Sequence, residues 1–152
     1  MKKLALTFLV LLFGITAFSQ ISTNTLGLRL GGGFGFDWEA SFQRACSEHS
    51  RMEMGLGMGI YSGYNGLNVS STYQWVWNIN GGFNWFAGPG AQIGSRAGNF
   101  YMGLHGQVGV EYLFSEIPIQ IGIDTRPTIS VANAANSFEI NVNTSIRYIF
   151  GK

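Results

Sequence analysis

The sequence predicts an all-β fold in which eight antiparallel strands run up and down and close into a barrel. The first observation is a two-residue alternation that begins at Leu26. Large apolar side chains occupy one set of positions, and glycine, amides and most charges occupy the other. The segment 52–60 is the clearest case, with apolar residues at every even position. Successive side chains of a strand point to opposite faces, so a period of two indicates β-structure.

The second observation is that the alternation recurs eight times, with turn signals rich in Gly, Asn and Ser between the repeats. No segment after residue 19 shows helical periodicity. The predicted strands cover residues 26–31, 36–43, 51–60, 67–77, 83–93, 100–112, 117–126 and 138–150.

In the first four strands the apolar positions hold leucine, aromatic residues and methionine. In chain order they are Leu26, Leu28, Leu30, Phe36, Trp38, Ala40, Phe42, Met52, Met54, Leu56, Met58, Ile60, Leu67, Val69, Tyr73, Trp75 and Trp77. The intervening positions are small or polar. They include Gly27, Arg29, Asp37, Glu39, Ser41, Gln43, Arg51, Glu53, Asn68, Ser70, Thr72 and Gln74.

The last four strands repeat the pattern with more isoleucine and valine. Their apolar positions are Phe83, Trp85, Ala87, Ala91, Ile93, Phe100, Met102, Leu104, Val108, Val110, Tyr112, Ile117, Ile119, Ile121, Ile123, Phe138, Ile140, Val142, Ile146, Tyr148 and Phe150. Two prolines interrupt the pattern, and proline cannot donate to a strand ladder. We expect a bulge or bend at Pro89 and a position at the barrel rim for Pro127.

The apolar face is expected to point outward into lipid. A soluble, lipocalin-like binding barrel has the same periodicity with its apolar face inward. However, the polar face here is rich in glycine, which has no use on a broad solvated surface and leaves room for larger neighbours in a narrow lumen. Eight rows of large apolar side chains would also overfill that lumen. The sequence therefore predicts a transmembrane β-barrel with a filled polar lumen.

The aromatic residues sort by strand direction, which supports this orientation. If the N-terminus lies in the periplasm, Trp75, Trp77, Trp85, Tyr112, Tyr148 and Phe150 fall at the periplasmic end of the barrel, and Trp38 falls at the outer end. Two aromatic girdles around an aliphatic band are typical of membrane barrels. We expect these seven residues to lie at the membrane interfaces.

Charged residues of both signs are expected to point into the lumen, where they would form a charge-paired plug. They are Arg29, Asp37, Glu39, Arg51, Glu53, Glu111, Asp124, Arg126, Glu139 and Arg147. Buried charges need partners, and the near-balance of signs supplies them. The alternative is a path for protons or ions. An eight-stranded barrel is just wide enough for its own side chains, so an open pore is not expected.

The first 19 residues have the pattern of a secretory signal peptide. Lys2 and Lys3 precede an apolar run, and Ala17 and Ser19 suit signal peptidase, so we expect cleavage before Gln20. The alternative, a membrane anchor, needs a longer run of roughly 20 apolar residues. Residues 20–152 then form one barrel domain.

Charge and composition limit the possible functions. Lys and Arg number 9 and Asp and Glu 8 in the whole chain, so no basic patch is expected to bind nucleic acid. Only 11% of residues are charged, against about 25% in soluble proteins. Cys46 is the only cysteine, which excludes an internal disulfide. We interpret it as a thiol in a turn, the alternatives being an intermolecular bond or a reactive thiol.

The sequence shows no convincing catalytic, metal or cofactor site. His105 is placed in the lumen, and His49 is placed in a turn beside Glu48 and Ser50. A hydrolase that modifies lipid A would need a histidine near a serine and an acid, with access to lipid, and no such set is apparent. Two separated histidines and one cysteine do not suit a metal. We therefore expect a protein that is not an enzyme and has no cofactor.

The chain resembles the small outer-membrane β-barrels of the OmpA/OmpX-like kind. Segments 109–112, 117–119 and 124–127 look like the penultimate hairpin of such barrels, and residues 146–150 look like their C-terminal aromatic signal. The resemblance implies a bacterial outer-membrane location, insertion by the barrel-assembly machinery and a monomer surrounded by outer-membrane lipid. A structural or weakly interactive envelope role follows as the leading hypothesis. A lipid A-modifying enzyme and a soluble secreted barrel remain the alternatives.

Overall fold

The computed structural model describes residues 24–32, 36–61, 64–96, 98–132 and 138–150. Eight strands account for nearly all of them. They are β1 (Asn24–Gly32), β2 (Phe36–Ser47), β3 (Ser50–Tyr61), β4 (Tyr64–Asn80), β5 (Phe83–Arg96), β6 (Asn99–Leu113), β7 (Ile119–Ala132) and β8 (Phe138–Phe150). The predicted signal peptide and its cleavage site lie outside the described residues.

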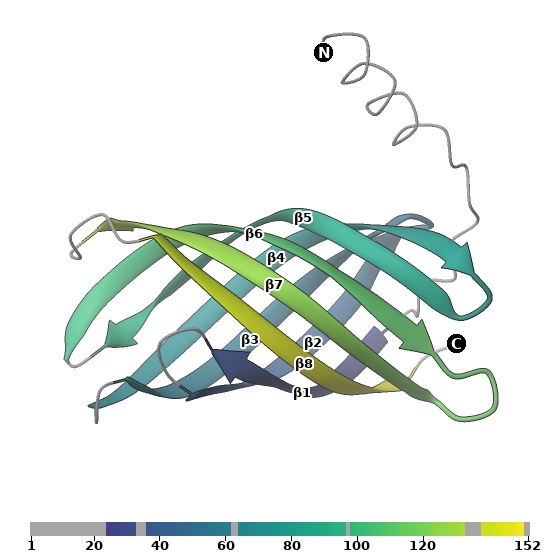
Figure 1. Cartoon of the computed structure of the whole chain (residues 1–152), viewed down its shortest axis with the longest axis horizontal. Coiled ribbons are helices and arrows are strands. Elements are labelled where there is room, and N and C mark those ends of the chain that lie inside the picture. The colour runs from purple at the N-terminus through teal and green to yellow at the C-terminus, as the bar shows by residue number, and fades with distance from the viewer. Residues whose placement is uncertain (1–23, 33–35, 62–63, 97, 133–137, 151–152) are drawn as a thin grey trace, which may run out of the picture.

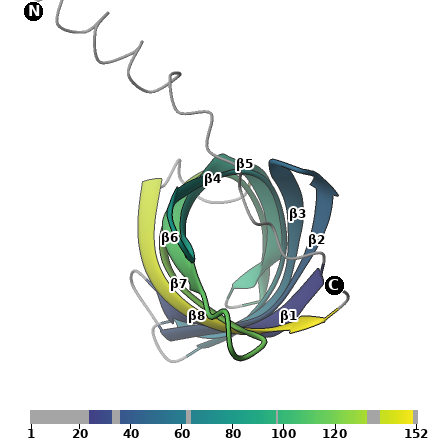
Figure 2. The same cartoon turned by 90° about the vertical axis from the view of Figure 1, so that its right-hand side faces the viewer.

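Each strand pairs antiparallel with its neighbours in the chain, and β8 returns to pair with β1. The closing seam runs from Asn24 opposite Phe150 to Gly32 opposite Val142 (Figures 1 and 2). Closure satisfies the backbone groups that an open edge would leave unpaired in hydrocarbon. The predicted eight-stranded up-and-down barrel is confirmed.

The outward face of the barrel is apolar. Leu56 in β3 is 59% exposed, whereas Gln74 in β4 is fully buried inside the barrel. Large apolar side chains are exposed in the same way on all eight strands. The inner positions hold buried Arg, Glu, Gln, Ser and Thr. This arrangement contradicts the soluble barrel with an apolar interior and confirms the fold of a transmembrane barrel with a filled polar lumen.

Glycines on the inner face make room for large inward side chains. A Cβ on Gly109 would lie 2.7 Å from Cζ of Phe86, and a Cβ on Gly90 would overlap the imidazole of His105. Neither glycine has a positive φ, so these two glycines are needed for space and not for an unusual backbone.

Of the bulge or bend expected at Pro89, the structure shows no bulge. Pro89 keeps its register opposite Gly106 of β6, and the β4–β5 register is the same on both sides of it. The pairing with β4 is interrupted at this point, between Thr72–Gly90 and Trp75–Ala87. Without an amide hydrogen, proline removes one donor from the ladder, which interrupts the pairing without shifting the register.

Pro127 does not lie at the rim. It sits in the interior of β7 opposite Ile140, and β6–β7 pairing is interrupted beside it, between His105–Thr128 and Val108–Thr125. Shifts of register occur elsewhere, between Ala45 and Ser47, between Asn78 and Asn80, and between Met102 and Gly103.

Most strands begin or end a few residues away from the predicted bounds, and two residues change assignment as a result. Cys46 lies within the exposed end of β2 and not in a turn, and Ile117 precedes β7 in the connection from β6. That connection lies at the same end of the barrel as the start of β1 and the end of β8 (Figure 1).

Candidate functional site

The lumen holds a network of ion pairs centred on Glu53 of β3. Its Oε2 accepts hydrogen bonds from Nε2 of Gln43 at 2.6 Å and Nε2 of Gln74 at 3.0 Å, and it pairs with the Arg147 guanidinium at 3.2 Å. Its Oε1 lies 3.5 Å from an Arg126 nitrogen. Glu53 is only 1% exposed, so nearly all of its charge is compensated by protein groups.

Glu39 of β2 joins Arg126 to a further arginine, Arg29, toward the end of the barrel distant from both termini. Its Oε1 pairs with Arg29 at 3.3 Å, and its Oε2 pairs with Arg126 at 3.1 Å. Arg29 also binds Asp124 of β7 through two of its nitrogens. Ser70 donates to Glu39 at 3.1 Å. Strands β1, β2, β4 and β7 thereby join across the lumen.

A separate pair lies toward the termini. Arg51 donates to both carboxylate oxygens of Glu111, at 2.9 and 2.7 Å. The fork geometry matches the planar carboxylate. The Arg51 guanidinium carbon lies 5.0 Å from the ring centroid of Phe86, within the range of a cation–π contact.

Three buried apolar side chains stand among these polar groups toward the termini, and the sequence analysis did not predict them. Val76, Phe86 and Ile149 are 0%, 1% and 7% exposed. Each lies two residues from an inward polar residue (Gln74, Asn84 and Arg147), so strict alternation places it in the lumen. Counting inward positions along each strand, whatever residue they hold, could have revealed them.

The structure brings most of the predicted lumen charges into ion pairs across the interior: Arg29, Glu39, Arg51, Glu53, Glu111, Asp124, Arg126 and Arg147. Asp37 and Glu139 are half-buried near the end of the barrel distant from the termini. The sequence analysis did not predict the part that amide side chains play in this network. Gln74 binds Arg51, Glu53 and Gln107, and Gln120 binds Glu111.

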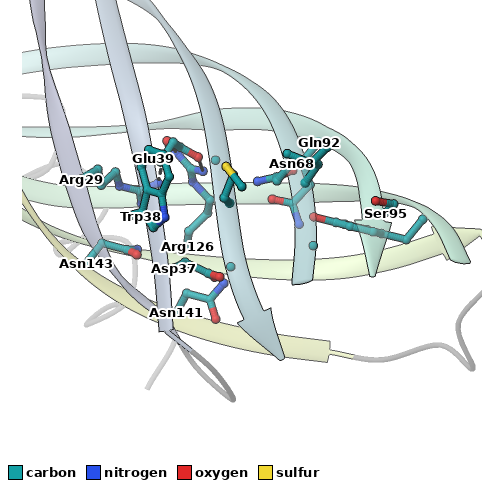
Figure 3. A pocket seen from close by; sticks show the side chains of 16 residues that line it. Arg29, Asp37, Trp38, Glu39, Asn68, Gln92, Ser95, Arg126, Asn141 and Asn143 are labelled. Atoms are coloured by element: carbon teal, nitrogen blue, oxygen red, sulfur yellow. Dashed lines mark hydrogen bonds and ion pairs between the residues drawn. The ribbon is translucent and has the colours of Figure 1, made fainter. Parts of the chain in front are cut away.

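A small cavity lies above the Arg29–Glu39–Arg126 cluster, at the end of the barrel distant from the termini (Figure 3). We call it the vestibule. It has a volume of about 30 Å³ and is lined by Arg29, Asp37, Trp38, Glu39, Gly57, Met58, Gly59, Gly66, Leu67, Asn68, Gln92, Ser95, Tyr101, Arg126, Asn141 and Asn143. Side chains from seven strands, all except β3, contribute polar groups to it.

The two histidines do not form a catalytic set. His105 is buried, and its Nε2 lies 2.8 Å from the Thr72 hydroxyl. His49 is exposed in the β2–β3 turn, where its amide donates to Ser47 Oγ at 3.3 Å. Among the described residues, no group of three or more His, Cys, Asp or Glu side chains is placed to hold a metal.

The seven predicted interface aromatics all lie on the outward face. Trp38, Trp75, Tyr148 and Phe150 are exposed, whereas Trp77, Trp85 and Tyr112 are half-buried against neighbouring rings. Trp77 and Trp85 stack with centroids 4.2 Å apart, and Tyr112 contacts Phe83 at 4.5 Å. These ring contacts lie near the end of the barrel at which β1 begins and β8 ends.

Two solved structures share this architecture. A designed protein from work on the de novo design of transmembrane β-barrels superposes with a TM-score of 0.61 at 16% identity, over 86% of this chain and 97% of that one. The crystal structure of Neisserial surface protein A (NspA) superposes with a TM-score of 0.60 at 10% identity, over 84% and 94%. Both likenesses support the transmembrane barrel fold.

No family model matches the chain, and no curated protein matches it. In the part of the chain that the structure describes, no helix is long and apolar enough to cross a membrane.

Proposed function

We propose that the chain is an integral outer-membrane barrel protein with a non-enzymatic, structural or weakly interactive role in the cell envelope. The observation that carries the proposal is that apolar side chains lie outside and charged side chains lie inside, the reverse of a soluble protein. Leu56 and its counterparts on every strand are exposed, whereas Arg51, Glu53 and Arg147 are nearly completely buried. An apolar face on every strand around a closed barrel is the surface that lipid stabilises.

The filled lumen supports a role other than that of an open pore. Ion pairs cross the interior from β1 to β7 and from β3 to β8, and Val76, Phe86 and Ile149 are buried in the same interior. Moving an ion along this path would require breaking buried pairs, at about 3–5 kcal/mol each. A plug of paired charges accounts for this arrangement of the lumen side chains.

The location and assembly belong to the same proposal. Residues 1–19 would direct export and be removed, and the barrel-assembly machinery would read the segment 146–150. The protein would then stand as a monomer in outer-membrane lipid, with the aromatic residues at the interfaces. A grouping with the OmpA/OmpX-like barrels is supported by the sequence resemblance and the shared fold.

The competing function is modification of lipid A, and a genetic experiment separates the two. Mass profiles of lipid A and uptake of a large hydrophobic dye are compared in deletion, wild-type and overexpressing strains. We expect unchanged acyl patterns and increased dye uptake in the deletion strain. An acyl pattern that changes with expression, and reverts with His105→Ala or His49→Ala, would overturn the non-enzymatic role.

A further inference from the structure

Arg44 is a charged residue on the apolar outer face of the barrel. Its neighbour Gln43 is buried in the lumen, whereas Arg44 is exposed and stands opposite Asn24 of β1 and Met52 of β3. Alternation along β2 directs its side chain outward. At the outward positions of the eight strands, as far as the structure describes them, every other residue is uncharged. Arg44 is therefore an exception to the pattern that sends charge into the lumen.

The guanidinium of Arg44 has no carboxylate of the described chain as a partner. Within the part of the chain that the structure describes, its side chain forms no ion pair or hydrogen bond, and only its carbonyl oxygen accepts, from Sγ of Cys46 at 3.8 Å. Arg29 and Arg51 in the lumen, by contrast, each bind a carboxylate. A charge beside apolar surface needs a compensating partner. For Arg44 that partner comes from the surroundings of the barrel.

Two pairs of aromatic rings place Arg44 at the level of a membrane interface. The ring centroids of Phe42 and Phe150 lie 6.2 Å apart on one side of it, and those of Tyr73 and Trp75 lie 5.2 Å apart on the other. One row of paired residues across β8, β1, β2, β3 and β4 connects the two ring pairs through Arg44. Aromatic girdles mark the depth of the lipid headgroups. An arginine that faces lipid is strongly destabilising at the midplane and is tolerated at this depth.

The phosphate of a membrane lipid suits this position better than a free anion does. A guanidinium binds phosphate through two parallel hydrogen bonds. One exposed charge holds a free anion weakly. A lipid also lays its acyl chains on the apolar surface beside the charge. Leu26 and Met54, which flank Phe42 on the neighbouring strands, are 52% and 47% exposed and supply that surface. The chains thereby keep the phosphate at a high local concentration.

We propose that Arg44 binds the phosphate group of a glycerophospholipid, whose acyl chains lie on the outer faces of β1, β2 and β3. The site is at the end of the barrel where β1 begins and β8 ends (Figure 1). The inference rests on the proposed membrane location and adds a lipid held at one place on the wall. With the N-terminus in the periplasm, that lipid belongs to the leaflet on the periplasmic side.

The test measures lipid binding to the protein purified from membranes in dodecyl maltoside. Native mass spectrometry counts the lipids bound to each barrel and gives the affinity of the first. Phosphatidylglycerol is titrated, and diacylglycerol with the same acyl chains is the probe without phosphate. We expect the barrel to bind phosphatidylglycerol in preference to diacylglycerol. Inorganic phosphate should not displace the lipid, which separates a lipid headgroup from a free anion as the ligand.

Variants assign the selected lipid to Arg44. Arg44→Gln should lower the affinity for phosphatidylglycerol about fivefold, the usual worth of one basic residue beside anionic lipid. Arg44→Lys keeps the charge but loses the two parallel hydrogen bonds, so a smaller loss is expected. Glu48→Gln, in the exposed β2–β3 turn, also changes the net charge by one unit and should not weaken binding. Diacylglycerol should bind equally to all of these proteins.

Three results would overturn the proposal: equal affinity of the wild type and Arg44→Gln for phosphatidylglycerol, an equal loss of diacylglycerol binding in Arg44→Gln, or displacement of the lipid by inorganic phosphate. Gel mobility before and after heating shows whether each variant is folded in the same micelles. A folded wild-type barrel that does not select phosphatidylglycerol overturns the lipid site alone. Recovery of the protein outside the membrane fraction overturns the proposed location instead.

Discussion

Single carboxylates link several strands inside this barrel, and Glu53 bonds four different residues. It accepts from two amides and pairs with two arginines on β7 and β8. Such a residue joins strands that are distant in the chain. Its loss would leave both guanidinium groups buried with fewer partners.

We therefore predict that Glu53→Ala lowers the free energy of unfolding by about 3–5 kcal/mol, as expected when one partner of a buried ion pair is removed. Urea titration of the protein in lipid vesicles measures this change. Glu48→Ala, in the exposed β2–β3 turn, serves as the control and should change stability by less than about 0.5 kcal/mol. Similar values for the two variants would contradict the network described here.

Two glycines on the same face of β3 differ in the space around them. A Cβ on Gly55 would overlap the Glu39 carboxylate, which Arg29 and Arg126 hold in place. A Cβ on Gly57 would meet nothing closer than the Trp38 carbonyl oxygen at 3.4 Å.

Gly55→Ala should therefore destabilise the barrel by about 1–3 kcal/mol, the usual cost of overpacking. Gly57→Ala should leave stability unchanged or raise it by about 0.4–1 kcal/mol, because alanine lowers the conformational entropy of the unfolded chain. Parallel urea titrations of the two variants test the difference. A larger loss for Gly57→Ala would mean that the inner packing is wrongly described.

At the scale of the strand, the two prolines mark the weakest pairing in the wall. Pro89 and Pro127 lie on either side of β6, level with Gly106. Each removes a ladder donor in the interior of a strand, where a membrane barrel has no water to replace it.

Pro127→Val would supply the missing amide, because valine suits strands and donates across the β6–β7 ladder. We expect stability to rise by about 0.5–1.5 kcal/mol and hydrogen exchange near Gln107 to slow. Pro118→Val, in the connection before β7, is the control, because it also removes a proline and so raises the conformational entropy of the unfolded chain by a similar amount. Faster exchange near Gln107 in Pro127→Val would refute the proposed cause of the interruption.

Closure of the sheet depends on the β1–β8 seam. Leu28 faces Ile146 across it, and partners in an antiparallel pair have Cα atoms about 4.5–5.5 Å apart, within reach of a disulfide. In a Cys46→Ser background, Leu28→Cys with Ile146→Cys should cross-link on oxidation. Leu28→Cys with Val142→Cys should not, because those positions are about 13 Å apart along the strand. Gel mobility without reductant reports the result, and equal cross-linking would argue against this register.

The strands and their faces were predictable because one period governs the whole barrel. Val76, Phe86 and Ile149 escaped the sequence analysis because they are apolar at inward positions, where a sorting by hydrophobicity expects polar residues. Pro127 was misread because a missing donor was taken to need a place at the rim, whereas at both Pro127 and Pro89 the pairing is interrupted within the strand. The partners within the lumen depend on side chains of strands distant in sequence, which periodicity does not specify.

At the scale of the whole molecule, the barrel is asymmetric along its axis. Paired charges fill its interior, buried apolar side chains stand among them toward the termini, and the vestibule lies at the far end. The two-residue alternation along eight strands places all of these side chains inside the barrel. Its outer consequence is an apolar belt that requires lipid, which is the central claim.

Folding into lipid vesicles tests that claim most directly. The protein lacking residues 1–19, diluted from urea into vesicles, should be protected from protease and should migrate differently on a denaturing gel before and after heating. Leu56→Arg, which places a charge on the exposed face of β3 at about 2–4 kcal/mol, should insert poorly, whereas Gly57→Ala should insert normally. Recovery of the wild-type protein as a folded monomer in buffer without lipid, with equal behaviour of both variants, would contradict the account.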